Sequence, residues 1–213
     1  MTFVPSPDIL AAFTLAALVL ILTPGPDMTL FIGETLRAGR ARGFAAMFGA
    51  ISGILIHSTL AAIGLSALLA ASATAYTALK IVGVAYLLWL ALQAIRHGSA
   101  LTIAADSGPR RPLAQSYLMG LGVNLLNPKI VMFFVTFLPQ FVSAADPHAG
   151  AKLLFLGLYF IVLSIPTCAV LIVTAERFTG AIRRAPRAMR VIDWLFAGLM
   201  GAFAVRLLFS RGN

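Results

Sequence analysis

Long apolar segments constrain this chain more than any other feature. Six of them are long enough to cross a bilayer, at 8–36, 44–69, 76–95, 116–141, 153–175 and 191–209. The hydrocarbon core is about 30 Å thick, and about 20 apolar residues in a helix cross it. The composition agrees, because 60% of the residues are hydrophobic and only 11% are charged, against about a quarter in soluble domains. The sequence therefore predicts an all-α, polytopic membrane protein with six transmembrane helices.

Helix-breaking residues interrupt the first and the fourth of these segments. Ile9 to Leu22 is a run of fourteen residues with one polar member, and as a helix it covers only about 21 Å. The motif Thr23-Pro24-Gly25-Pro26-Asp27 therefore falls inside the bilayer, and Asn127-Pro128-Lys129 interrupts the fourth segment in a similar way. Backbone groups freed by a break are tolerated at membrane depth only beside protein or a water-filled cavity. Both breaks are therefore candidate binding sites.

The positions of the breaks predict two related halves. Each half has three apolar segments and begins with a broken one, so we expect a three-helix repeat at 1–100 and another at 116–213. A linker at 101–115, which contains Ser107-Gly108-Pro109, separates them. Because three spans precede the second half, its orientation in the membrane is inverted. Inverted repeats with interrupted helices are typical of secondary transporters.

Asp27 and Lys129 are the charges located at the two breaks. A charge at the bilayer centre costs roughly 2.5–3.5 kcal/mol even on the mildest scales, so each requires water, a partner or a substrate. One interpretation is a shared cavity for a zwitterion, with its ammonium near Asp27 and its carboxylate near Lys129. The alternative is an Asp27–Lys129 ion pair that only locks the halves together.

The neighbours of these charges are expected to shape the site. Asn124 and Asn127 bracket the second break and can bind its disrupted backbone, with or without contacting the substrate. The remaining substrate-binding candidates shape the backbone at the two breaks: Pro24, Gly25, Pro26 and Pro128.

Two further ionisable residues lie within apolar segments. His57 is near the middle of the second segment, and histidine can exchange a proton near neutral pH. Together with Asp27 it is a candidate for proton coupling, the alternative being a neutral histidine that hydrogen-bonds across helices. Glu34 lies about two helical turns after Asp27, and its position near the end of the first segment predicts an interfacial charge.

The basic residues indicate the orientation and a lipid contact. The first, third and fifth loops carry eleven Lys and Arg residues, and the second and fourth carry one. The positive-inside rule places the odd loops in the cytoplasm and both termini outside. We therefore attribute the formal net charge of +9 to topology and to anionic lipid, and expect no nucleic-acid partner. The cluster expected to contact anionic headgroups is Arg183, Arg184, Arg187 and Arg190.

Several classes of function find no support in the sequence. The chain has one cysteine, and it contains no nucleotide-binding, zinc-protease or serine-hydrolase motif. We therefore expect no cofactor, no resident metal and no enzymatic activity. A small-residue stripe at Gly49-Ala50-Ile51-Ser52-Gly53 predicts close helix packing, either within the subunit or in a homo-oligomer.

Four motifs in order resemble those of the LysE/RhtB family of amino-acid exporters. They are Leu22-Thr23-Pro24-Gly25-Pro26-Asp27, Arg40-Ala41-Arg42-Gly43, Gly83-Val84-Ala85-Tyr86-Leu87, and Asn127-Pro128-Lys129 followed by Phe133-Phe134 and Leu138-Pro139-Gln140-Phe141. The resemblance covers about 8–209. It implies a protein of the bacterial cytoplasmic membrane that exports amino acids or related metabolites, driven by a proton or ion gradient. No residue selects one class of amino acid.

Three other interpretations remain at this point. An ion or metal exporter would have to bind its cargo with one acid and one histidine at depth, which is a poor metal site. An intramembrane enzyme would need a nucleophile beside a base, and the sequence shows no such pair. In a purely structural membrane subunit, apolar residues of similar size could replace both Asp27 and Lys129.

Overall fold

The computed structural model describes residues 4–65, 73–97, 112–143, 146–184 and 186–209. Every regular element in these ranges is a helix, and none of the described residues forms a strand. The all-α prediction is therefore confirmed for the part of the chain that is described. The expected linker at 101–115 and its motif Ser107-Gly108-Pro109 lie largely outside these ranges.

The first apolar segment folds as two helices, α1 (Pro7–Leu22) and α2 (Pro26–Ala38), which meet at 51°. Pro24 lies between the two helices, and Pro26 occupies the first turn of α2. Backbone N–H groups in a first turn have no partner within the helix, so a proline there costs no hydrogen bond. At the end of α1, the Thr23 hydroxyl donates a hydrogen bond to the Val19 carbonyl at 2.6 Å. One carbonyl of the last turn is therefore bonded to a side chain that directly follows the helix. Gly39, with φ of 93°, then turns the chain into α3 (Arg40–Leu60).

The second broken segment repeats this plan. The α6 helix (Leu113–Leu126) ends at Asn127, and α7 (Pro128–Met132) starts with Pro128, again with a bend of 51° across the break. The segment continues as the π-helix η2 (Phe133–Phe137) and the 3₁₀-helix η3 (Leu138–Phe141). Pro139 lacks the N–H that a longer α-helix would need.

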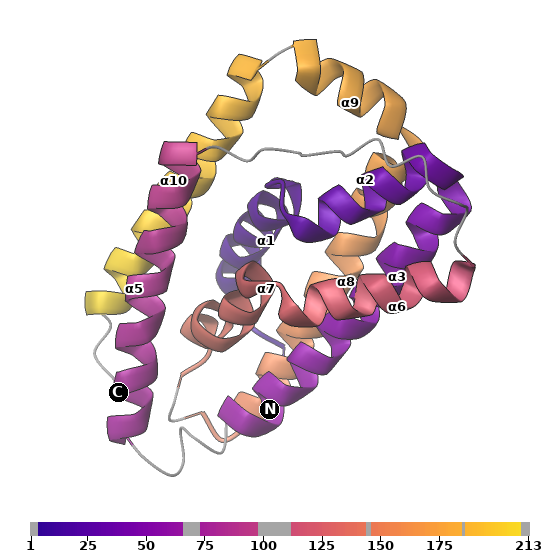
Figure 1. Cartoon of the computed structure of the whole chain (residues 1–213). Helices are drawn as coiled ribbons and strands as arrows, with labels where there is room; N and C mark the ends of the chain where they lie inside the picture. The colour runs from indigo at the N-terminus through magenta and orange to yellow at the C-terminus, as the bar shows by residue number, and fades with distance from the viewer. Residues whose placement is uncertain (1–3, 66–72, 98–111, 144–145, 185, 210–213) are drawn as a thin grey trace.

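The remaining elements complete the bundle in Figure 1. The π-helix η1 (Ala61–Leu65) extends α3, and α5 (Ala73–His97) lies alongside α10 (Pro186–Phe209). Between α8 (Ala149–Val173) and α10 the expected fifth loop instead contains a helix, α9 (Ala175–Arg184). Its alternation of basic and apolar residues suits a helix lying along a membrane surface.

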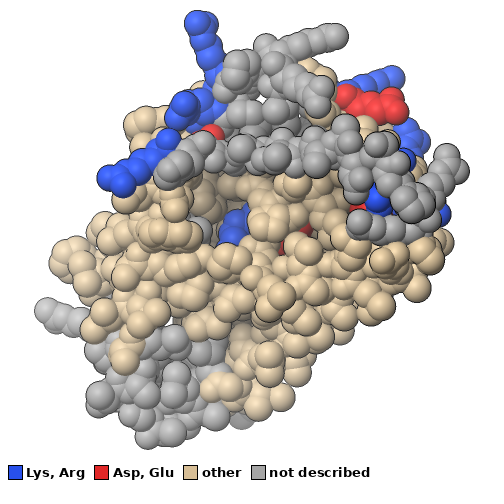
Figure 2. Space-filling model, viewed as in Figure 1, with Lys and Arg blue, Asp and Glu red and all other residues tan. Residues whose placement is uncertain are grey.

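Length and apolarity identify up to four membrane-spanning units among the described residues. Arg40–Gly64 and Ala149–Val173 each qualify alone, and the two bent pairs each qualify as one broken span. Outward-facing large apolar side chains are common along the bundle, with Leu126 83% and Phe209 77% exposed. Figure 2 shows the same property as a broad tan face, with Lys and Arg gathered at one end. Such a surface is suited to lipid rather than to water.

Glycines bring α3 and α6 into backbone contact. A Cβ on Gly49 would lie 1.9 Å from the carbonyl oxygen of Tyr117, and a Cβ on Gly120 would lie 1.9 Å from that of Ala46. Gly53 in turn packs against the Asn124 side chain. The small-residue stripe of α3 is therefore used within the subunit, and it gives no support to a homo-oligomer.

This packing predicts a sharp difference between two glycines on α6. Gly120→Ala should destabilise the protein by about 1–3 kcal/mol, because the new methyl group meets an Ala46 carbonyl that cannot move freely. Gly122→Ala is the matched control, since a Cβ there has open space, and alanine favours the helix by roughly 0.5–1 kcal/mol. Thermal unfolding of both variants in detergent measures the difference. Equal stability of the two would contradict the described α3–α6 contact.

Candidate functional site

The two helix breaks meet in space through Lys129. Its Nζ donates to the Thr23 carbonyl at 2.8 Å and to the Leu20 carbonyl at 3.2 Å. These carbonyls belong to the last turn of α1, where helix geometry leaves them without partners and the helix dipole is negative. A cation from the second half thus caps a helix of the first half.

Gly25 makes room for this cap. A Cβ at this position would lie 3.0 Å from Lys129 Nζ and 3.3 Å from Cε. Its backbone is extended, with φ of −169°, which any residue adopts. The requirement for glycine is therefore one of space, because the lysine stem occupies the volume that a side chain would fill.

Asp27 binds the second half in a reciprocal arrangement. Its Oδ2 accepts hydrogen bonds from the Nδ2 atoms of Asn124 and Asn127, each at 3.0 Å. Asn127 also caps α7, because its Oδ1 accepts the Lys129 N–H at 3.0 Å. These bonds bring the two breaks into contact, as the interpretation of a shared cavity requires.

The two breaks also share a register. In each case a proline occupies the first helical position and a charged residue follows it, as Pro26-Asp27 in α2 and Pro128-Lys129 in α7. Both prolines are exposed, whereas Pro24 is buried. The prolines therefore direct the backbone, and Asp27, Asn124 and Lys129 face the interior.

The direct ion pair that the sequence left open does not form. Asp27 and Lys129 are both fully described, and no Asp27–Lys129 contact falls within 4.0 Å. Each charge is held instead by neutral groups of the opposite half, Asp27 by amides and Lys129 by carbonyls. The halves are joined by charge–dipole hydrogen bonds.

A cavity of about 50 Å³ lies beside these groups. Its polar lining includes Asp27, Asn124 and Lys129, and most of its wall is apolar. Figure 2 shows blue and red atoms within a recess in the otherwise tan face. The cavity is therefore a small internal space where charged groups of both halves meet an apolar wall.

Several polar atoms at this cavity retain bonding capacity. Asp27 Oδ1 and Asn124 Oδ1 are buried and have no hydrogen-bond partner among the described residues. An ammonium has three N–H groups, and Lys129 Nζ uses two of them on described carbonyls. Asn124 Oδ1 lies against Gly53 of α3, so the cavity is left with one unused carboxylate oxygen on Asp27 and one unused N–H on Lys129. These two groups could bind an ammonium and a carboxylate, respectively.

His57 lies behind this cavity and does not line it. Its ring stacks on Phe134 with centroids 5.8 Å apart, and its Nε2 is buried without a partner among the described residues. It also interacts with the backbone of Asn124 and with the charge of Asp27. The structure therefore places His57 close to Asn124, which is bonded to Asp27.

Glu34 is not the interfacial charge that the sequence predicted. It is only 4% exposed, its Oε1 accepts from Arg37 Nη2 at 2.5 Å, and its Oε2 accepts from the Ser116 hydroxyl at 2.6 Å. Ser116 belongs to α6, so Glu34 is a second link between the halves. The sequence contains one indication of this burial. Glu34 follows Asp27 by seven residues, or two helical turns, and therefore lies on the same face of α2.

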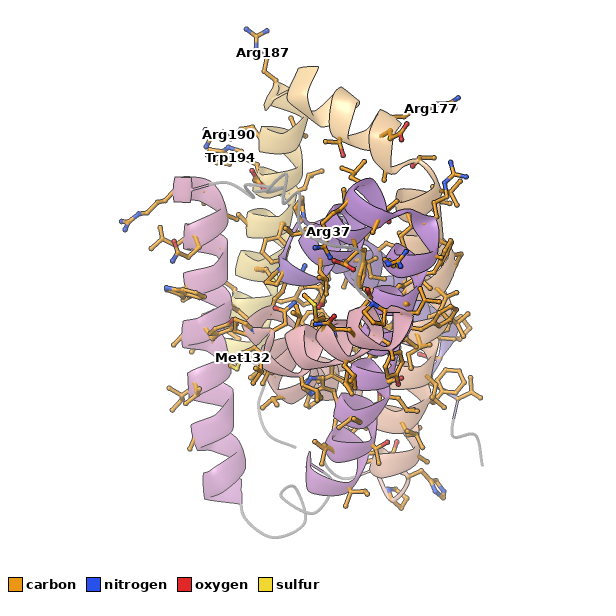
Figure 3. The ribbon with its side chains drawn as sticks, turned by 45° about the vertical axis from the view of Figure 1, so that its right-hand side comes forward. Arg37, Met132, Arg177, Arg187, Arg190 and Trp194 are labelled. Atoms are coloured by element: carbon orange, nitrogen blue, oxygen red, sulfur yellow. The ribbon has the colours of Figure 1, made fainter. Side chains whose placement is uncertain are left out.

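The arginine-rich end of the bundle is only partly described. Figure 3 shows Arg177, Arg187 and Arg190 at the same end, and all three are exposed. The side chains of Arg183 and Arg184 lie outside the described residues. As for metals, no three His, Cys, Asp or Glu side chains come together in the described part of the chain.

Comparisons with known proteins give relatives along almost the whole chain. A "Threonine efflux protein" of Salmonella typhimurium is 31% identical, covering 93% of this chain and 98% of the relative. A "Homoserine/homoserine lactone efflux protein" of the same organism is 29% identical, with 94% and 96% covered. A "Leucine efflux protein" of Enterobacter sp. is 26% identical, with 92% of each covered. No solved structure matches the chain.

The family model that matches is that of the LysE type translocators, over residues 18–211. Its members are transporters, so the interpretation as an intramembrane enzyme is excluded, and the predicted localisation in a bacterial membrane agrees with the relatives. The motifs that suggested the resemblance include the two helix breaks that meet in the structure. This chain belongs to the LysE type translocator family.

Proposed function

We propose that the chain is a secondary transporter that exports amino acids or related small metabolites across the bacterial cytoplasmic membrane. The observation that carries this proposal is the pairing of an unused carboxylate oxygen on Asp27 with an unused N–H on Lys129, both on residues that line one cavity between the halves. An α-amino acid presents an ammonium and a carboxylate a few ångströms apart, which suits this arrangement. The relatives named for threonine, homoserine and leucine efflux support the same class of substrate.

The architecture of the proposed transporter is six spans in two inverted repeats. The α5 and α10 helices, of 25 and 24 residues, are each about 36 Å long at 1.5 Å per residue, enough to serve as the third span of each half. The equal bends of 51° and the shared proline–charge register support a duplication. The repeats would then be 1–100 and 116–213, with 101–115 between them.

Transport by this architecture requires the site to open alternately to each side. A cavity of about 50 Å³ is far below the roughly 300 Å³ of ordinary ligand sites, so substrate must expand it. A larger cavity of about 490 Å³, lined by Thr35, Arg40 and Arg177, lies at the arginine-rich end. It begins one helical turn beyond the inner cavity, because Phe31 lines the inner one and Thr35 the outer. We assign this end as the entrance.

Energy coupling is proposed to use a proton. His57 and Asp27 are the candidates, joined through Asn124, whose amide is bonded to Asp27 and whose backbone interacts with His57. Protonation of either residue would change the charge beside the substrate ammonium, and so link the two binding events.

The entrance is assigned to the cytoplasmic face. The positive-inside rule supports this orientation, and the exposed Arg177, Arg187 and Arg190 share that end (Figure 3). There they are positioned to contact anionic headgroups, and the sequence predicts the same role for Arg183 and Arg184.

The orientation predicts opposite labelling of two introduced cysteines. In a Cys168→Ser background, His148→Cys should react with a membrane-impermeant thiol reagent added to spheroplasts, because the loop before α8 is outside. Arg187→Cys should react only after permeabilisation. Both native side chains are exposed, which makes the positions comparable. The reverse pattern would invert the assigned topology.

The transport proposal predicts that both charges are needed for export but not as an ion pair. Asp27→Asn and Lys129→Met should each lower export at least about tenfold, the loss expected for ~1.4 kcal/mol of differential binding. The double variant should stay inactive, because the described charges bind neutral groups rather than each other. Export rates and detergent melting temperatures, with the exposed Asp8→Asn as control, measure this. Recovery of export and stability in the double variant would instead indicate a structural lock.

A further inference from the structure

We propose that the transported amino acid carries an uncharged, apolar side chain of the size of valine, leucine, isoleucine or methionine. This inference rests on the proposed function, and it concerns the part of the cavity that the ammonium and carboxylate do not use.

The charged groups at the cavity are already assigned to the head of the substrate. Asp27 Oδ1 is an unused acceptor for the ammonium, and Lys129 has one N–H for the carboxylate. Among the described residues, no other charged side chain lines the cavity. A second charge on the substrate would therefore enter the apolar part of the cavity without a partner, which is strongly unfavourable. Lysine-like and glutamate-like substrates are excluded on this ground.

The rest of the cavity wall provides few hydrogen-bond partners for a hydroxyl group on the substrate side chain. Ser164 lines the cavity, but its hydroxyl donates to the Phe160 carbonyl at 2.8 Å inside α8. Its oxygen can still accept one bond, so one contact to a threonine-like side chain is available in place of the several that water provides. The thiol of Cys168, which also lines the cavity, is only a weak hydrogen-bonding partner.

Five helices contribute apolar side chains to the wall: α1, α2, α3, α7 and α8. Met28 and Phe31 come from α2, Met47 and Ile54 from α3, and Leu171 from α8. All five are at most 7% exposed, so a side chain entering between them would leave water almost completely. Burial of each methylene is favourable, and the two methionines can change rotamer to admit branched or linear chains. The wall therefore selects for aliphatic volume.

The test measures exchange rather than net export, so that it does not depend on the coupling ion. Purified protein is reconstituted in liposomes preloaded with one unlabelled amino acid, and entry of the same labelled amino acid is followed. Leucine, threonine, lysine and glutamate are compared. Leucine exchange should exceed threonine exchange at least about tenfold, and lysine and glutamate should remain at the level of empty liposomes.

Two serine variants on α3 test whether the wall makes the selection. Ile54→Ser alters the cavity wall, and Leu55→Ser makes a comparable change at the next residue, which is 46% exposed on the outer surface. Ile54→Ser should lower the leucine-to-threonine exchange ratio at least about tenfold, because it removes apolar contacts and adds a hydroxyl. Leu55→Ser should leave the ratio unchanged. Thermal shifts caused by each amino acid in detergent supply a second readout that is independent of transport.

The outcomes separate this inference from the proposed function. Preferred exchange of threonine, lysine or glutamate would overturn the inference while supporting amino-acid transport. A ratio that Ile54→Ser leaves at its wild-type value, in a folded protein, would also overturn it, because the wall would then not contact the substrate. Neither exchange nor a thermal shift with any of the four would overturn the proposed function, and the inference with it.

Discussion

The structure depends on side chains that bind the two broken helices to each other. A helix that ends inside a membrane leaves carbonyls that neither lipid nor its own backbone can satisfy. Here Lys129 supplies the donors for the end of α1, and Asn124 and Asn127 hold the carboxylate at the start of α2. Removing a single partner would leave a buried polar group unpaired, so the two halves specify each other's position.

This arrangement explains how the same residues can hold the fold together and still bind a ligand. A direct ion pair would use the hydrogen-bonding atoms of both groups on each other, whereas Asp27 and Lys129 attract each other at a distance and bind neutral groups. Asp27 keeps one free carboxylate oxygen and Lys129 keeps one N–H. The structural and functional interpretations of these residues are therefore compatible. Gly25 contributes to both, because its missing side chain lets the ammonium reach the carbonyls.

The sequence was informative where a residue is unusual for a membrane helix, such as a proline or a charge. It was uninformative about which of the many apolar residues line the cavity. Prolines and charges inside apolar runs predicted the breaks and the contact between them. The sequence did not identify Met28, Met47 or Ile54 as cavity residues, because nothing local distinguishes a cavity-facing apolar side chain from a lipid-facing one. Glu34 was predicted at the interface from its distance along the chain, whereas its burial depends on Ser116 of α6. Such a partner is visible only after folding.

The layer of protein that separates the central cavity from the outside differs in thickness between the two ends of the bundle. Towards the arginine-rich end, Phe31 at the inner cavity and Thr35 at the outer one are four residues apart on α2, or about 6 Å. Towards the other end, a cavity of about 650 Å³ is lined by Leu10 of α1. Leu10 is ten residues from Leu20, which lines the central cavity, or about 15 Å along the helix. That longer path is filled by aromatic rings, with Phe13 and Phe141 centroids 5.2 Å apart and those of Phe133 and Phe137 4.9 Å apart. Opening at the arginine-rich end therefore separates one layer of side chains, whereas opening at the other end must separate an interlocked aromatic core.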